Sequence, residues 1–174
     1  MPKPIKIDLP YPNLNQIDKD YKTAYILAPA FAGGHGELNA VLQYVYHFFN
    51  FNGENEKEIA QTFMGIAIAE MEHLKILGEL LYKLGADPVF TKIPPCKFDF
   101  YSTKSISYSK LPVKMLLDDL SGEMLAVKDY KAMVDNICNE QVSSVICRII
   151  LDEELHIKVL KDILKKYYNG LEYC

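Results

Sequence analysis

The stretch Glu70–Leu77 reads EMEHLKIL, and later in the chain Glu153–Leu160 reads EELHIKVL. Each stretch places a glutamate and a histidine three residues apart and continues with apolar residues at helical spacing. Residues three apart lie on the same face of a helix, so the glutamate and the histidine share the face that carries the apolar residues. The spacing therefore predicts two helices that each turn a Glu-x-x-His pair toward the protein interior.

An approximate repeat surrounds the two pairs. Gly36–Tyr44 reads GELNAVLQY and Gly122–Tyr130 reads GEMLAVKDY, with Gly, Glu, Ala, Val and Tyr at matching places. A Glu-x-x-His pair follows each segment at a similar interval. The sequence thus predicts two related helical hairpins, each of which contributes one isolated glutamate and one Glu-x-x-His pair.

The helical segments are separated by turn and proline signals. An earlier turn from Lys19 bends at Pro29, Asn55 with Glu58 forms a capping box, and several prolines exclude a regular helix from residues 85–112. The pattern predicts an all-α four-helix bundle, in which two antiparallel hairpins are joined by a long crossover. We expect a single domain over residues 1–174, with helices at about 30–51, 56–84, 113–136 and 141–168 and the crossover at 85–112.

Composition limits the class of partner. The 174 residues are 49% hydrophobic and 24% charged, which suits a globular domain with a sizeable core. A net charge of -4 offers no basic surface for nucleic acid, and no apolar run has the length of a membrane span or a signal peptide. We expect a cytoplasmic protein without nucleic-acid or membrane partners, whose four cysteines, lacking any CxxC pair, are free thiols.

Buried carboxylates decide what the interior must contain. Four glutamates fall within the apolar stripes of the four helices, and no Lys or Arg falls on those stripes. Bare anions at such positions lose solvation and repel one another, so two divalent cations, with the histidines as neutral ligands, would balance the charge. Carboxylate and imidazole together suit iron or manganese and also zinc. The predicted ligands are Glu37, Glu70, His73, Glu123, Glu153 and His156.

Several neighbouring residues have two interpretations. Tyr44 and Tyr130 each lie seven residues beyond a ligand; they are core aromatics or, alternatively, hydroxyl donors to the metal carboxylates. The two other histidines, at positions 35 and 47, lie off the stripe and are left out of the site. The acidic residues beside the ligands are expected to be solvated flanks, any of which could instead orient a ligand histidine: Glu72, Asp152 and Glu154.

The segments AGGHGELNAVLQY, AEMEHLKIL, GEMLAVKDY and LDEELHIKVL resemble those of the ferritin-like di-metal carboxylate proteins, especially rubrerythrins and manganese catalases. The resemblance covers residues 25–168 and implies the same six metal ligands. It implies one of three reactions, because relatives use this set of ligands for iron oxidation, peroxide reduction or peroxide dismutation. In manganese catalases the counterpart of Glu153 lies near the metals without being a full ligand. The segment GGHGEL, residues 33–38, also resembles the corresponding segment of manganese catalases.

The leading hypothesis is a dinuclear iron or manganese oxidoreductase that acts on hydrogen peroxide or dioxygen. Peroxide reduction would need an external electron donor, since the sequence has no CxxC knuckles, whereas dismutation needs none. One alternative is a ferritin-like protein that oxidises or stores iron, and another is a structural or interaction bundle stabilised by its metals. The resemblance further implies a homodimer.

Overall fold

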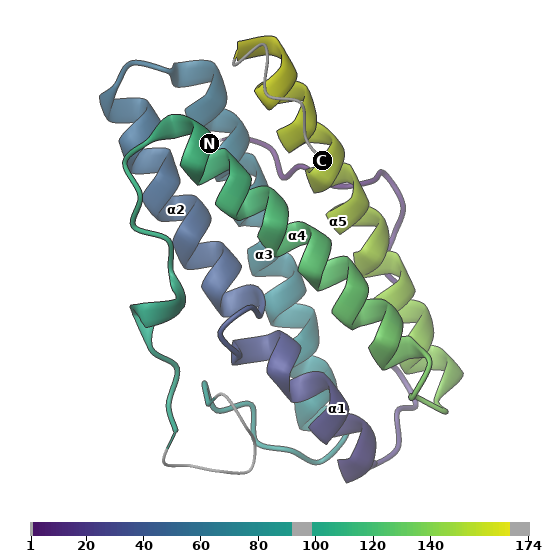
Figure 1. The fold of residues 1–174 in the computed structure, drawn as a ribbon. Helices are drawn as coiled ribbons and strands as arrows, with labels where there is room; N and C mark the ends of the chain where they lie inside the picture. Colours follow the sequence, from purple (N-terminus) through teal and green to yellow (C-terminus); the bar gives the residue numbers. More distant parts are fainter. Residues whose placement is uncertain (1, 92–98, 168–174) are drawn as a thin grey trace.

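The computed structural model describes residues 2–91 and 99–167 and confirms the all-α four-helix bundle (Figure 1). Four long helices form the bundle, a shorter helix precedes them, and the crossover contains one turn of 3-10 helix. Their bounds are α1 (Tyr21–Ala32), α2 (Glu37–Gly53), α3 (Lys57–Lys83), η1 (Thr103–Ser105), α4 (Pro112–Val134) and α5 (Glu140–Tyr167).

The bundle consists of two helical hairpins. The closest neighbours are α2 with α3 and α4 with α5, while α1 lies mainly against α3 at one end of the bundle. The second described part of the crossover, residues 99–111, runs along the bundle to the start of α4 (Figure 1). This arrangement brings the two Glu-x-x-His helices, α3 and α5, into contact.

The predicted helix at about 30–51 is wrong at its beginning. Ala30 belongs to α1, which contains Pro29, and α2 begins only at Glu37. The chain turns between the two helices because the backbone at Gly36 lies directly against the end of α1. A Cβ at Gly36 would meet the carbonyl oxygen of Ala30 at 2.4 Å, so a side chain does not fit there. The turn makes Glu37 the first residue of α2.

The predicted capping box at the start of α3 is also absent. Asn55 has a φ of 64° and forms the turn itself, and the N-cap residue of α3 is Glu56, which makes no side-chain capping bond. Asparagine tolerates the left-handed conformation better than most residues, which suits it to this turn. The predicted bounds of the three later helices agree closely with α3, α4 and α5; the last predicted helical residue, Tyr168, lies outside the described residues.

Two apolar clusters flank the predicted metal ligands along the bundle. In α3, Ile66 belongs to one cluster and Leu77 to the other, with Glu70 and His73 between them. The polar residues therefore occupy the middle of a bundle whose two ends are filled by close-packed aliphatic and aromatic side chains. Among the described residues, no helix is long and apolar enough to span a membrane.

Candidate dinuclear metal site

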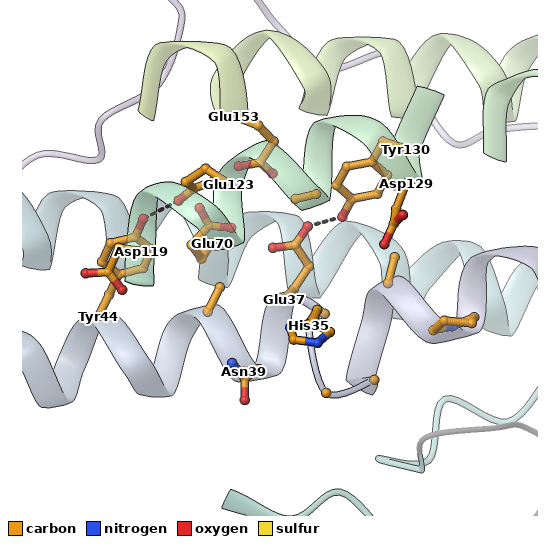
Figure 2. Close-up of a pocket in the computed structure, with 18 of the residues that line it drawn as sticks. His35, Glu37, Asn39, Tyr44, Glu70, Asp119, Glu123, Asp129, Tyr130 and Glu153 are labelled. Carbon is orange, nitrogen blue, oxygen red and sulfur yellow. Dashed lines mark hydrogen bonds between the residues drawn. The ribbon is translucent and has the colours of Figure 1, made fainter. Parts of the chain in front are cut away.

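The structure brings all six predicted ligands together in the middle of the bundle. Each of the four long helices contributes one glutamate, and Figure 2 shows the four carboxylates pointing toward one space. The two histidines come from α3 and α5. None of the six residues is more than 5% exposed: Glu37, Glu70, His73, Glu123, Glu153 and His156.

The six side chains form two overlapping groups. One group consists of Glu37, Glu70, His73 and Glu153, and the ligand atoms that its members offer all lie within 4.8 Å of one another. The second consists of Glu70, Glu123, Glu153 and His156 under the same limit. Glu70 and Glu153 belong to both groups. The arrangement is that of two adjacent cation sites with two shared carboxylates, as in a dinuclear centre.

Both histidines turn the Nδ1 atom toward the carboxylates. Nδ1 of His73 lies 3.1 Å from Glu153 Oε1 and 3.2 Å from Glu70 Oε2. Nδ1 of His156 lies 2.9 Å from Glu70 Oε1 and 3.1 Å from Glu153 Oε2. Nδ1 is therefore the ring atom that each histidine offers to a metal ion.

The outer nitrogen of each ring has its own partner. Nε2 of His73 lies 3.2 Å from Asp152 Oδ2, and Nε2 of His156 lies 2.7 Å from the carbonyl oxygen of Ile5. A backbone carbonyl can only accept, so His156 donates its Nε2–H and a neutral ring leaves Nδ1 bare. Despite burial, hydrogen bonds from His73, Tyr11 and Arg148 hold the pKa of Asp152 below its usual range. The Asp152 carboxylate therefore accepts the Nε2–H of His73 and leaves Nδ1 of that ring bare. Both rings are thus held in the tautomer that binds metal through Nδ1.

The carboxylates show where cations fit. Glu70 Oε1 and Glu153 Oε1 are buried. Within the part of the chain that the structure describes, each faces a histidine Nδ1 atom, at 2.9 Å and 3.1 Å, and accepts no regular hydrogen bond. When the facing Nδ1 is bare, such a buried oxygen has no partner, which is costly, and a divalent cation is the partner that four carboxylates and two imidazole nitrogens prefer. The residues present therefore fit a pair of metal ions.

The surroundings of four of the six side chains favour their protonated forms when no cation is bound. Burial, together with the charges of Glu70 and Glu153, raises the pKa of Glu37 and of Glu123 well above the ordinary value. Burial opposes a charge on the histidines, but the facing glutamates outweigh it and raise the pKa of both rings. These four groups therefore bind protons more tightly than free side chains do, and metal binding competes with those protons.

Two tyrosines tie the hairpins together at the site. The hydroxyl of Tyr44 in α2 donates to Glu123 Oε1 in α4, and that of Tyr130 in α4 donates to Glu37 Oε1 in α2 (Figure 2). Burial and the facing carboxylate raise the pKa of each phenol, so both remain donors. This is the second of the two interpretations that the sequence left open for these residues.

Asp152 corrects the prediction of a solvated flank. It is fully buried, and it accepts hydrogen bonds from the Ile7 amide at 2.7 Å and the Tyr11 hydroxyl at 2.6 Å. Arg148 lies 2.8 Å from its Oδ1 atom. The alternative role predicted for Asp152, that of orienting a ligand histidine, agrees with its contact to His73. Glu72 and Glu154 do lie toward the surface, in ion pairs with lysines.

A third buried histidine lies outside the two ligand groups. His47 in α2 contacts Asp119 Oδ2 through Nδ1 at 2.7 Å and the Ser107 carbonyl oxygen through Nε2 at 3.0 Å. Gln43 donates to the other oxygen of Asp119 at 2.7 Å. The sequence placed His47 off the apolar stripe, whereas the structure buries it fully, and the sequence gave no sign of this network. The sequence feature that could have indicated the network is a polar residue one helical turn beyond Tyr44 on a buried helix.

Comparisons with known proteins agree with this fold and site. The family profile for ferritin, described as a ferritin-like domain, matches residues 35–168. The chain therefore belongs to the ferritin-like domain family, and the resemblance noted in the sequence is confirmed. A bacterioferritin from Desulfovibrio desulfuricans is 26% identical over 153 residues, which cover 86% of this chain and 78% of the relative.

Two kinds of solved structure are similar. KatB, a manganese catalase from Anabaena, superposes with a TM-score of 0.80 at 19% identity, covering 97% of this chain and 83% of that chain. Bacterioferritin from Rhodobacter capsulatus gives a TM-score of 0.69 at 26% identity, covering 87% and 88%. The likeness to the catalase shows a shared fold. Together with the buried Glu/His cluster, the comparisons define a ferritin-like protein with a site of the dinuclear type.

Proposed function

We propose that this protein is a dinuclear iron or manganese oxidoreductase that acts on hydrogen peroxide or dioxygen. The observation that carries the proposal is a pocket of about 190 Å³ that reaches the acid cluster. Its inner lining includes Glu37, Glu70, Glu123 and Glu153. Its lining also includes His35 and Asp129, which are exposed, so the pocket extends from the cluster to the surface.

An accessible site favours catalysis over a purely structural role. Structural metal sites are normally closed by protein ligands, whereas catalytic sites keep a position open to substrate. The size of the pocket suits a molecule of a few atoms rather than an organic substrate, for which pockets are usually several hundred cubic ångströms. Peroxide and dioxygen meet that limit. The pocket also makes a structural or interaction bundle the weakest of the three hypotheses.

The side chains assign roles at the proposed centre. The four carboxylates and the Nδ1 atoms of the two histidines would hold the ions, and two such ions, when bound, would accept and return the electrons of the reaction. Asp152 and the Ile5 carbonyl keep the rings in their binding tautomer. Tyr44 and Tyr130 hold the two outer carboxylates in place and keep a proton next to Oε1 of each. The apolar clusters on either side restrict water to the pocket.

The test is peroxide turnover after loading with each metal. Protein stripped of metal and reloaded with Mn²⁺ or Fe²⁺ is mixed with hydrogen peroxide while peroxide loss and oxygen release are followed. Dismutation converts two peroxides into two waters and one dioxygen without a donor, whereas peroxidase activity consumes a reductant and releases no oxygen. Absence of turnover with both metals, with and without a donor, would refute the oxidoreductase proposal.

Iron oxidation and storage is the second candidate, and the bacterioferritin similarity favours it. A storage protein holds many irons per chain inside a large closed shell, whereas an oxidoreductase of this type holds two. Native mass with iron analysis after aerobic addition of Fe²⁺ separates the two candidates. The same measurement tests the homodimer that we expect for the oxidoreductase.

A further inference from the structure

The two halves of the site are related by the repeat, yet the partners of their histidines are not. The tyrosine hydrogen bonds match across the repeat, since each links one hairpin to the isolated glutamate of the other. The Nε2 atoms of the two histidines do not have matching partners. His73 meets the side chain of Asp152 in α5, whereas His156 meets the backbone carbonyl of Ile5, which lies far from the helices in sequence.

Matched positions on α3 and α5 explain the difference. Aligning Glu70 with Glu153 pairs Ala69 with Asp152, one residue before the glutamate, and Gly65 with Arg148, five residues before it. Asp152 reaches across to His73, but Ala69 has no polar atom that could reach His156. The half of the site that contains His156 therefore lacks a side-chain acceptor at the repeat position.

The N-terminal strap, residues 3–11, fills that position. The Ile5 amide donates to the carbonyl oxygen of Gly65 at 3.0 Å, and the Ile5 carbonyl oxygen accepts from His156 at 2.7 Å. Gly65 makes the approach possible, because a Cβ there would lie 3.0 Å from both Ile5 Cγ1 and the Lys3 carbonyl oxygen. Small residues on α3 thus admit the strap to the histidine.

The α5 side holds the strap by polar contacts. Arg148 donates to the carbonyl oxygens of Ile7 at 2.6 Å and Leu9 at 2.9 Å. Asp152 accepts from the Ile7 amide at 2.7 Å. The Tyr11 ring lies beneath the Arg148 guanidinium, 4.6 Å from its centroid. The two polar residues of α5 therefore secure the strap, and the two small residues of α3 receive it.

We propose that the N-terminal strap is a positioning element of the metal site, which supplies through Ile5 the histidine acceptor that Ala69 does not provide. This inference rests on the proposed dinuclear centre. It requires that the His156 half of the site depend on the strap while the His73 half keeps its own acceptor. Loosening the strap at Ile5, while Arg148 still holds Asp152, should then weaken the binding of one ion of the two.

The test uses Gly65→Leu in the full chain. Leucine favours the α3 helix more than glycine does but takes the space of Ile5 and Lys3. Loss of an outer hydrogen bond typically lowers metal affinity about 10–100-fold, so we expect one of two Mn²⁺ affinities to fall by about that factor and the other to change little. Gly53→Leu is the matched control, since a Cβ at Gly53 meets nothing within 4 Å.

A spectroscopic readout shows which histidine responds. In zinc-loaded, ¹⁵N-histidine-labelled protein, both His73 and His156 should show a protected Nε2–H proton. Gly65→Leu should lose the His156 signal alone. Adding Ala69→Asp to Gly65→Leu should restore the signal and the second affinity, because the new carboxylate stands at the position that matches Asp152. Should Gly65→Leu disturb folding, Ile5→Pro removes the amide that anchors Ile5 to Gly65 and leaves the helices unchanged.

The outcomes separate this inference from the proposed function. If the wild-type chain binds fewer than two ions, the dinuclear centre and the inference both fail. If wild-type binds two and the strap variants keep both affinities, or lose both equally, the strap has no specific positioning role although the centre stands. The same conclusion follows if both Nε2–H signals persist or if Ala69→Asp restores nothing.

Discussion

Glu70 and Glu153 differ from the other four predicted ligands because each belongs to both groups of the site. A substitution at a shared carboxylate should therefore weaken both ions, whereas one at Glu37 should weaken mainly the ion on the His73 side. We expect Glu70→Gln to reduce the metal content from two ions per chain toward none, and Glu37→Gln to leave about one ion bound. Equilibrium dialysis at limiting free metal, followed by elemental analysis, measures both ratios.

Glu154→Gln is the control for this comparison. Glu154 is adjacent to Glu153 but pairs with Lys131 at the surface, 48% exposed, so its replacement should leave the metal content unchanged. Equal losses for Glu70→Gln and Glu37→Gln would contradict the shared arrangement. The result for Glu153→Gln decides separately whether Glu153 is a ligand or only a neighbour of the ions, which the resemblance to manganese catalases left open.

The Tyr44 hydroxyl should matter most in the metal-free protein. Tyr44→Phe removes the donor to a buried oxygen of Glu123, and an unsatisfied buried acceptor costs about 1–3 kcal/mol. We expect the free energy of unfolding of the metal-free protein, measured in urea, to fall by that amount. Tyr46→Phe, in the same helix, removes only an exposed 3.3 Å contact to Tyr108 and should change it by less than about 0.5 kcal/mol. Equal effects of the two variants would argue against the role of Tyr44.

At the scale of helices, His47 joins α2 to α4 and to the crossover. His47→Ala would leave a cavity, deprive buried Asp119 of a partner and release the Ser107 carbonyl. We expect a loss of about 3 kcal/mol or more in the free energy of unfolding, and faster proteolysis within the crossover. His35→Ala, an exposed histidine two residues before the start of α2, should leave both measurements near wild type. A stable His47→Ala protein with a protected crossover would show that the network is dispensable.

The later helices were predictable from sequence because their apolar residues keep a helical period without a break. The division between α1 and α2 was not, because it depends on how closely the Gly36 backbone approaches Ala30, which no periodicity records. Asn55 was misread for a related reason. An asparagine before a helix can cap it or form the preceding turn, and only the backbone conformation tells these apart.

The burial of the six predicted ligands could be foreseen from the sequence because each carboxylate or imidazole interrupts an apolar stripe. The groups around them were less predictable. Asp152 lies off that stripe and reaches across to the other Glu-x-x-His helix, so its burial depends on how α3 and α5 pack. Ile5 acts through its backbone carbonyl, and a carbonyl is the same for every residue type. The sequence therefore indicated the predicted ligands of the site but only some of the groups that hydrogen-bond to them.

At the scale of the whole molecule, metal binding should contribute directly to stability. A ligand that binds only the folded state at one hundred times its Kd adds about 2.7 kcal/mol per site. For a chain of 174 residues, two such sites correspond to a rise in Tm of about 10–20 °C. Differential scanning calorimetry with and without a chelator measures this difference. Glu70→Gln should respond far less to the chelator, and an unchanged wild-type Tm would contradict a bound metal pair.

The same cluster predicts how metal affinity depends on pH. Burial raises the pKa of Glu37 and Glu123, and the facing glutamates raise the pKa of His73 and His156 despite burial, so in the metal-free protein these four groups keep their protons to higher pH than free side chains do. Each metal ion must displace protons, and these groups release them more easily as pH rises. Apparent affinity for Mn²⁺ should therefore increase with pH across the neutral range and decrease on acidification.

Titration calorimetry in buffers of different ionisation enthalpy tests this directly, since it counts the protons released per ion bound. Net proton release is expected, and Glu37→Gln should reduce it, because one group that holds a proton in the metal-free site is gone. Glu154→Gln should leave the count unchanged, because that exposed carboxylate lies outside the cluster. An affinity independent of pH, or net proton uptake, would mean that the buried acids are ionised before metal arrives and that another cation already balances them.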